Sequence, residues 1–387
     1  MEGSAALQTL PPVTPSFAHG PVDCDRVAML ERLERVEGLL DQHRYVDALG
    51  ELDGVAVPRV SAPDLVLRVL LAESWARLYV GELEQATAVA DRARVLADGR
   101  VFTDADRAAA MFALGCCRRK LGKITNAISL FTSALALAER GAGARTVRLR
   151  ARILEWRSNC YQVQREWEAA QADAERSLEL AEEAGDGRAA SHALMQCSLV
   201  AERRGDALTA RLYAERAHAL ADETGDRQLA ARALNNLGGL SFLLGEAETA
   251  VSYLKDSFAL SLELGNDADA AQAVSSLAQV HLRCGAPQLA EEQARHALSI
   301  LDDRDDYVDE RGNAHLVLGR ALLEQGRVDE AMREFAAAEW LFERFGSPSH
   351  VAAAWTAQGD AYRRSGDDAA ALDLYRRAVD ALQDFRF

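Results

Sequence analysis

Residues 233–260 read ALNNLGGLSFLLGEAETAVSYLKDSFAL, two largely apolar segments joined at Gly245. Glycine is common just past a helix end because it adopts a left-handed backbone conformation without steric cost. Ala, Leu, Glu and Ser dominate the two flanks and proline is absent from them, which is typical of helices. The stretch therefore predicts two antiparallel helices joined by a tight turn.

The same turn recurs along the chain at a fixed interval. Glycines lie 20 residues apart at six consecutive positions, and the interval returns in the C-terminal third. An acidic residue that can cap the next helix follows several of them, as in Gly205-Asp206. The interval predicts helices of roughly 16–18 residues joined by very short loops. The glycines are Gly185, Gly205, Gly225, Gly245, Gly265 and Gly285, then Gly326, Gly346 and Gly366.

Three columns of residues repeat in register with alternate turns, and small residues that face each other let antiparallel helices approach closely. The first column, the small column, lies seven residues before the turn and holds Ser74, Gly115, Ser158, Ser198, Gly238, Ala278, Gly319 and Gly359. The second lies five residues after the turn and holds Ala86, Ala127, Ala170, Ala210, Ala250, Ala290, Ala331 and Ala371. The third follows the second by seven residues and holds Ala93, Ala134, Ser177, Ala217, Ser257, Ala297, Ala338 and Ala378. These columns establish an internal repeat.

The columns and the turn glycine resemble the tetratricopeptide repeat family over about residues 62–387, as eight repeats. The period of 40 to 43 residues is longer than the common 34 and is similar to that of the sensor and adaptor regions of bacterial regulators. The resemblance implies an all-α, right-handed superhelical solenoid of antiparallel helix hairpins. We expect residues 26–61 to form a divergent N-terminal hairpin. Residues 1–25, which hold four of the eight prolines, are expected to form a disordered tail.

Composition excludes several classes of function. A net charge of −16 argues against a protein whose whole surface binds nucleic acid or anionic lipid. No apolar run is long enough to span a bilayer, and the N-terminus lacks a signal-peptide pattern. Catalytic motifs and metal-ligand spacings are absent from the sequence, so we expect no enzyme, no cofactor and no metal site. The acidic run Asp302–Glu310 lacks the pattern of a calcium loop and is interpreted as a solvated turn.

The six cysteines are scattered and form no C-x-x-C pair. Five fall inside helical patterns, where Cys behaves as a small buried hydrophobe. They fit a reducing compartment better than a disulfide framework, so we expect a cytoplasmic protein. The cysteines are Cys24, Cys116, Cys117, Cys160, Cys197 and Cys284.

Charge is distributed unevenly. Residues 115–165 contain eleven basic and two acidic residues, a net charge of +9, whereas the remainder of the chain carries −25. Steps of three or four place Arg145, Arg148 and Arg152 on one helix face, and the resemblance implies that this is the concave face. Two interpretations stay open: a solvated face of Arg-rich helices, or a surface that binds an acidic segment or another anion.

Further along, the same face carries neutral polar residues. Asn and Gln both donate and accept hydrogen bonds, which suits the backbone of an extended peptide, and Asn235 resembles asparagines that clamp peptide backbones in the family. The alternative is an exposed polar face without function. The candidate partner-binding residues are Arg119, Arg145, Arg148, Arg152, Asn159, Gln162, His192, Arg232, Asn235, Gln272, Gln279 and Asn313.

We predict a non-enzymatic adaptor or scaffold that binds a peptide or partner segment in its concave groove. The alternative is a peptide- or ligand-sensing regulator of a separate transcription factor or enzyme. A nucleic-acid binder is a weaker interpretation, because the basic stripe covers only two repeats.

Apolar residues of the last helix, including Leu382 and Phe385, either pack against a second copy of the chain in a homodimer or fold back onto the preceding repeat.

Overall fold

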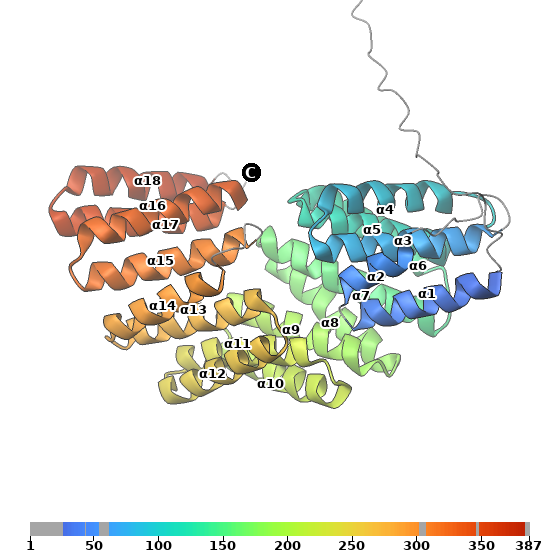
Figure 1. Cartoon of the computed structure of the whole chain (residues 1–387), viewed down its shortest axis with the longest axis horizontal. Helices are drawn as coiled ribbons and strands as arrows, with labels where there is room; N and C mark the ends of the chain where they lie inside the picture. Colours follow the sequence, from blue (N-terminus) through green and yellow to red (C-terminus); the bar gives the residue numbers. More distant parts are fainter. Residues whose placement is uncertain (1–25, 43, 54–61, 302–306, 346–347, 384–387) are drawn as a thin grey trace, which may run out of the picture. The chain divides into compact units, whose positions relative to one another are not determined.

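The computed structural model describes residues 26–42, 44–53, 62–301, 307–345 and 348–383, and every regular element in these ranges is an α-helix (Figure 1). The all-α fold is thereby confirmed, while the predicted disordered tail lies outside the described residues. The helices are α1 Arg26–Asp41, α2 Tyr45–Leu52, α3 Pro63–Val80, α4 Leu83–Ala97, α5 Asp104–Lys120, α6 Ile124–Ala138, α7 Ala144–Val163, α8 Trp167–Glu183, α9 Gly187–Arg203, α10 Ala207–Thr224, α11 Arg227–Leu243, α12 Ala247–Glu263, α13 Asp267–Arg283, α14 Pro287–Ile300, α15 Val308–Glu324, α16 Val328–Phe345, α17 Pro348–Ser365 and α18 Asp368–Gln383.

The chain forms two compact units, Met1–Val89 and Ala90–Phe387. In the first unit, α1 packs against α2 and α3, and Met29, Leu33 and Leu65 lie at the centre of this contact. Within the described residues, no helix is long and apolar enough to cross a membrane. The division of residues 26–387 into a divergent hairpin and eight repeats stays a prediction.

The second unit, Ala90–Phe387, is a stack of helix hairpins that follow one another from α5–α6 to α17–α18 (Figure 1). Each second helix packs against its own first helix and against the first helix of the next hairpin. First helices also pack against one another across hairpins, from α5 with α7 to α15 with α17, whereas the backbones of the described second helices stay further apart and meet through long side chains, such as Arg216 of α10 with Glu182 of α8 at 3.1 Å. The first helices therefore lie on the inner side of the stack, and the predicted solenoid of hairpins is confirmed.

The turn inside each hairpin needs a left-handed residue. At Gly205, with φ of 86°, the backbone N–H donates to Glu202 and the next N–H donates to Ala201, so two free carbonyl groups of α9 are satisfied. The Asp206 carboxylate then accepts from the N–H of Thr209 and caps α10. Arg165 occupies the same turn position between α7 and α8 with φ of 59°, which is unusual for a residue with a Cβ atom.

The small column packs against the residue that lies 16 positions later, on the second helix. A Cβ atom added at Gly115, Gly238, Gly319 or Gly359 would lie 2.5–2.6 Å from the side chain of Phe131, Leu254, Phe335 or Tyr375. Where the small column holds a larger residue in this unit, the later position is Ala: Ser158 with Ala174, Ser198 with Ala214 and Ala278 with Ala294. A glycine on the first helix therefore faces a large side chain on the second, and a larger residue faces Ala. The combined side-chain volume between the two helices stays nearly constant.

The hydroxyl groups of serines in the columns also have hydrogen-bond partners. The Ser158 and Ser198 hydroxyls donate to the carbonyl oxygens of Ala170 and Ala210, at 2.7 and 2.8 Å.

Cys116, Cys117, Cys160 and Cys197 are buried, as predicted. The prediction was wrong for Cys284, which is exposed because it follows the last residue of α13. Cys24 lies outside the described residues.

Candidate functional site

Ion pairs join successive first helices along the inner side of the second unit. Arg148 Nε on α7 lies 3.2 Å from Asp186 at the start of α9, and His192 Nε2 on α9 lies 3.1 Å from Asp226 at the start of α11. Arg232 on α11 lies 2.9 Å from Asp269 in the first turn of α13. In each of these inner-face ion pairs the carboxylate lies at a helix N-terminus, where the helix dipole favours negative charge.

Asp226 is the most enclosed of these carboxylates, with a side chain that is 2% exposed. Its oxygens accept from Arg188 Nε at 2.8 Å, from the N–H of Leu229 at 3.1 Å and from His192. Since a carboxylate only accepts, His192 Nε2 carries the proton of that contact. Burial of Asp226 raises the pKa of its carboxyl, but hydrogen bonds from His192 and Leu229 and the charges of His192 and Arg188 outweigh this and hold it far below its ordinary range.

We expect Asp226→Asn to lower the free energy of unfolding by about 1–3 kcal/mol near neutral pH, because Asn keeps the cap but loses the charge. A carboxyl whose folded pKa is depressed stabilises the protein above its unfolded pKa, and this contribution is lost as the pH falls towards the folded value. The difference between the two proteins should therefore shrink between about pH 5 and pH 2. Urea unfolding at a series of pH values measures it.

Asp206→Asn is the matched control, because Asp206 caps α10 through the N–H of Thr209 and is exposed. Little change in unfolding is expected from it, since Asn caps helices as well as Asp. A constant stability difference for Asp226→Asn over the whole acid range would contradict the assignment of the charge effect to Asp226.

Several of the sequence-predicted partner-binding residues meet each other in the structure. Arg119 Nε on α5 donates to Asn159 Oδ1 on α7 at 2.5 Å, and burial lowers the pKa of this guanidinium. Gln162 Nε2 on α7 donates to Gln196 Oε1 on α9 at 2.8 Å. A run of polar contacts therefore crosses from α5 to α9.

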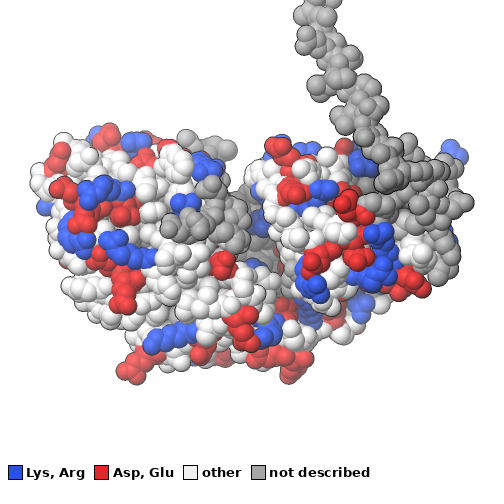
Figure 2. All heavy atoms as spheres, in the orientation of Figure 1, with Lys and Arg blue, Asp and Glu red and all other residues white. Residues whose placement is uncertain are grey.

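The Arg145, Arg148 and Arg152 face is partly neutralised. Besides the Arg148 pair, Arg145 lies 3.9 Å from Asp106 of α5 and its side chain is 79% exposed. The Arg152 guanidinium lies 5.3 Å from the centre of the Phe112 ring. On the face of the molecule that Figure 2 shows, basic and acidic side chains are interspersed. Binding of an acidic segment at this face stays a prediction.

The remaining candidates lie on α11, α13 and α15. Asn235 is half-buried on α11, and its side-chain oxygen is fully buried without a hydrogen-bond donor among the described residues. Gln272 and Gln279 are exposed on α13. Asn313 on α15 donates to Asp309 at 3.3 Å. Their role in partner binding stays a prediction.

Comparisons with known proteins agree with this architecture. A family model described as tetratricopeptide repeat matches residues 229–303 and 310–384, and a second model with the same description matches residues 110–144. The chain is a tetratricopeptide-repeat protein. No curated protein sequence matches it significantly.

Solved structures with the same fold span nearly the whole tetratricopeptide-repeat chain. A Rap protein complexed with competence and sporulation factor superposes with a TM-score of 0.69 at 16% identity, over 92% of this chain and 98% of that one. The apo quorum sensor NprR from B. thuringiensis gives 0.64 at 11%, over 91% and 98%. Aspartyl phosphate phosphatase F from Bacillus subtilis gives 0.60 at 15%, over 94% and 96%. At these identities the likeness establishes the fold.

The structure places two residues of the acidic run on a helix. Asp309 and Glu310, assigned from the sequence to a solvated turn, lie in the first turn of α15, and burial raises the pKa of both carboxyls. The interpretation as a turn was therefore wrong for these two residues, while residues 302–306 of the same run lie outside the described residues.

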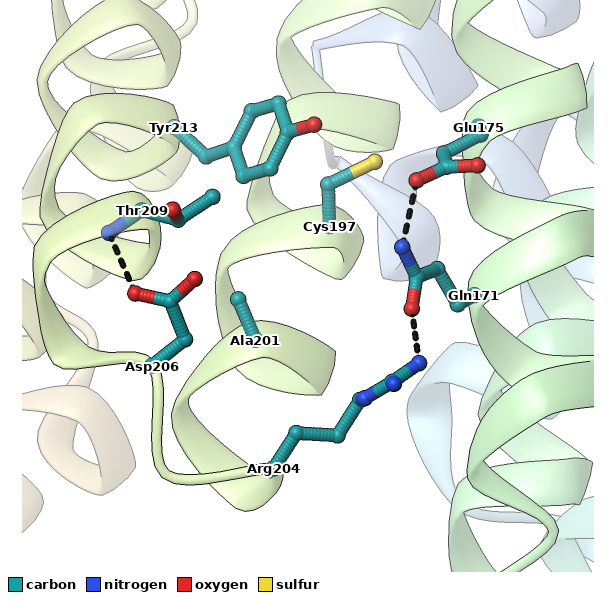
Figure 3. Close-up of a pocket in the computed structure, with 8 residues that line it drawn as sticks. All are labelled: Gln171, Glu175, Cys197, Ala201, Arg204, Asp206, Thr209 and Tyr213. Carbon is teal, nitrogen blue, oxygen red and sulfur yellow. Dashed lines mark hydrogen bonds between the residues drawn. The ribbon is translucent and has the colours of Figure 1, made fainter.

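A hollow of about 290 Å³ lies between α8, α9 and α10 (Figure 3). Gln171 accepts a hydrogen bond from Arg204 and donates to Glu175 at 2.6 Å. Burial raises the pKa of the Cys197 thiol to about 12, so the thiolate form is scarce at neutral pH. Gln171, Glu175 and Arg204 at the hollow are therefore paired with one another, and the Cys197 thiol is a poor nucleophile there.

The small side chain of Ala201 leaves room on one wall of the hollow. Ala201 lies three residues after the small column, a position that holds Tyr161, Leu322 and Tyr362 in three repeats and Arg118, Ser241 and His281 in the others of the second unit. A missing large side chain leaves unfilled volume between neighbouring helices. We therefore interpret the hollow as a packing feature, and the inner side of the first helices as the candidate binding surface.

The predicted oligomer edge is only partly apolar and exposed. On α18, Leu372 and Val379 are 49% and 50% exposed, whereas Leu374 is buried and Leu382 is half-buried. Phe385 lies outside the described residues. Dimerisation through this helix stays a prediction.

Proposed function

We propose that this chain is a non-enzymatic cytoplasmic adaptor that holds an extended peptide, or an extended segment of a partner protein, against the inner side of its first helices. The observation that carries the proposal is the buried, unpartnered side-chain oxygen of Asn235. Leaving a buried acceptor unpaired costs about 1–3 kcal/mol. A rotation of the half-buried Asn235 amide would turn this oxygen towards the inner side, where a backbone N–H of a bound peptide supplies the missing donor and the amide nitrogen can donate to a peptide carbonyl in return.

The surroundings of Asn235 support the same assignment. The inner-face ion pairs fix the first helices on both sides of it, so the surface is formed before the ligand arrives and the ordering cost of binding is reduced. Exposed amides at Gln272 and Gln279 continue the surface along α13. Amide side chains spaced along a rigid surface suit a ligand whose main feature is its backbone.

Peptide binding is tested with the full chain and a random pool of peptides of about eight residues, identified by mass spectrometry after capture. We expect Asn235→Ala to weaken the affinity for the retained peptides about tenfold or more, because two hydrogen bonds to the backbone are lost. Isothermal titration calorimetry gives the affinities, and circular dichroism verifies that helicity is unchanged.

Gln288→Ala is the control, because Gln288 is an exposed amide on the second helix α14, away from the inner side. It should bind the retained peptides as the unmodified chain does. Capture of no peptide, or an unchanged affinity for Asn235→Ala, would show that the inner side is not a peptide-binding surface.

A second candidate function is a peptide-sensing regulator of a separate transcription factor or enzyme. Structures with the same fold include a Rap protein in complex with competence and sporulation factor and a protein named a quorum sensor. In this function the bound peptide changes the affinity of the chain for the controlled protein. Co-purification from lysate, with and without a retained peptide, separates a sensor from an adaptor whose partner binding does not respond.

A further inference from the structure

Two leucines of α10 lie on the outer side of the second unit, one helical turn apart. Leu208 and Leu212 are each 61% exposed. On the opposite face of α10, Ala210 and Ala214 are buried in a cluster with Leu237 of α11. The two leucine side chains therefore add little to the core of the stack.

The other hairpins of the second unit provide an internal comparison for these positions. Leu208 lies two residues before Ala210, which belongs to the second repeated column, and Leu212 lies two residues after it. Before the column, the other hairpins hold Thr125, Glu168, Glu248, Gln288, Asp329 and Ala369. After the column, they hold Ser129, Ala172, Ser252, Glu292, Arg333 and Asp373. All of these residues are polar or Ala, so the repeat itself does not call for leucine at either position.

A groove of about 570 Å³ lies beside the leucines on the surface of α10. The groove is lined by Thr209, Leu212, Tyr213, Glu215, Arg216 and Ala219. These residues recur every three or four positions, so the groove follows one face of the helix. Exposed leucines next to a groove are typical of a surface that binds another molecule.

The groove suits a helix better than an extended chain. Backbone groups in the middle of α10 are hydrogen-bonded within the helix, so an extended segment finds no main-chain partner there. Side chains one turn apart form a ridge, and a second helix accepts such a ridge between its own side chains. An amphipathic helix also satisfies its own backbone and buries only its apolar face.

The surroundings of the groove are acidic. The second helices in this part of the stack, α8, α10 and α12, carry twelve acidic and four basic residues. The two arginines nearest the leucines are already in ion pairs, Arg211 with Glu246 at 2.9 Å and Arg216 with Glu182 at 3.1 Å. The excess of carboxylates therefore favours a partner with basic residues beside its apolar face.

We propose that Leu208, Leu212 and this groove bind an amphipathic helix of a partner protein, with large apolar side chains on one face and Lys or Arg along its edges. The site lies on the outer side of the stack, whereas the proposed peptide-binding surface lies on the inner side of the first helices. The chain therefore has two separate binding surfaces, as an adaptor that joins two partners requires.

The test uses the full chain and a displayed library of helical peptides of about 16 residues, long enough for roughly four turns. Leu, Phe or Trp is fixed along one face, and Ala, Lys, Arg and Glu vary elsewhere. We expect the retained helices to be enriched in Lys and Arg over Glu. They should bind the double variant Leu208→Ser/Leu212→Ser about tenfold more weakly or worse, as measured by fluorescence anisotropy.

Leu289→Ser is the matched control, because Leu289 is 47% exposed on α14 and does not line the groove. It should bind the retained helices as the unmodified chain does. Thermal unfolding should be unchanged in both variants, because the replaced side chains are exposed.

Retention of no helix, enrichment in Glu, or full binding by Leu208→Ser/Leu212→Ser overturns the proposal. A dimer that light scattering detects and the double variant abolishes also overturns it, because the surface then binds a second copy of the chain. None of these outcomes bears on peptide binding at Asn235, which has its own test.

Discussion

Replacing Gly238 by Ser is expected to lower the free energy of unfolding by about 2–3 kcal/mol, although Ser occupies the equivalent position in two other hairpins of the second unit. The reason is local volume. A Cβ atom at position 238 would lie 2.5 Å from Cγ and 2.7 Å from Cδ2 of Leu254, and a buried leucine cannot yield that space without strain. Urea unfolding followed by far-UV circular dichroism measures the loss.

The double variant Gly238→Ser/Leu254→Ala recreates the pair found at Ser198 and Ala214. Leu254→Ala alone should cost about 2–4 kcal/mol because it leaves a cavity. We expect the double variant to be more stable than either single variant, with the new hydroxyl donating to the carbonyl of Ala250 as Ser198 donates to Ala210. If the losses in free energy of unfolding were additive in the double variant, the side chains at positions 238 and 254 would not compete for the same volume.

Replacing Asp173 by Ala is expected to destabilise the second unit by about 3–5 kcal/mol. Arg157 on α7 and Asp173 on α8 form a bidentate ion pair, with N–O distances of 2.6 and 2.8 Å and side chains that are 14% and 10% exposed. Without Asp173, the guanidinium is left buried with Thr132 as its other hydrogen-bond partner. Thermal and urea unfolding report the loss.

Two further variants isolate the cause. Glu246→Ala removes an ion pair of similar geometry, with Arg211 at 2.9 Å, from a more exposed site, and should change stability by no more than about 1 kcal/mol. Arg157→Leu/Asp173→Ala removes both charges and should recover much of the loss. If Asp173→Ala and Glu246→Ala lowered the free energy of unfolding equally, burial would not explain the contribution of the Arg157–Asp173 ion pair to stability.

The hairpins and their order could be predicted from the sequence because the turns and helix contacts tolerate few residue types. A left-handed turn calls for Gly, and a close approach of two helices calls for Gly, Ala or Ser, so both leave regular columns. Arg165 shows the limit of this signal: the turn at position 165 forms without Gly, because neighbouring hairpins define the helices on either side.

The inner-face ion pairs could not be predicted in the same way. Arg148 and Asp186 belong to different repeats, and their contact depends on how far the stack curves, which no local pattern encodes. Asp226 was recognisable as a helix cap from Gly225-Asp226, but its bonds to Arg188 and His192 were not.

The placement of the inner-face ion pairs has a mechanical consequence. Apolar contact between first and second helices resists separation at any salt concentration, whereas partly exposed pairs such as Arg232 with Asp269 weaken as counterions screen them. We therefore expect the inner side of the stack to bend more easily as ionic strength rises, while the hairpins themselves stay folded. A charged ligand that contacts several of these pairs is expected to oppose that bending.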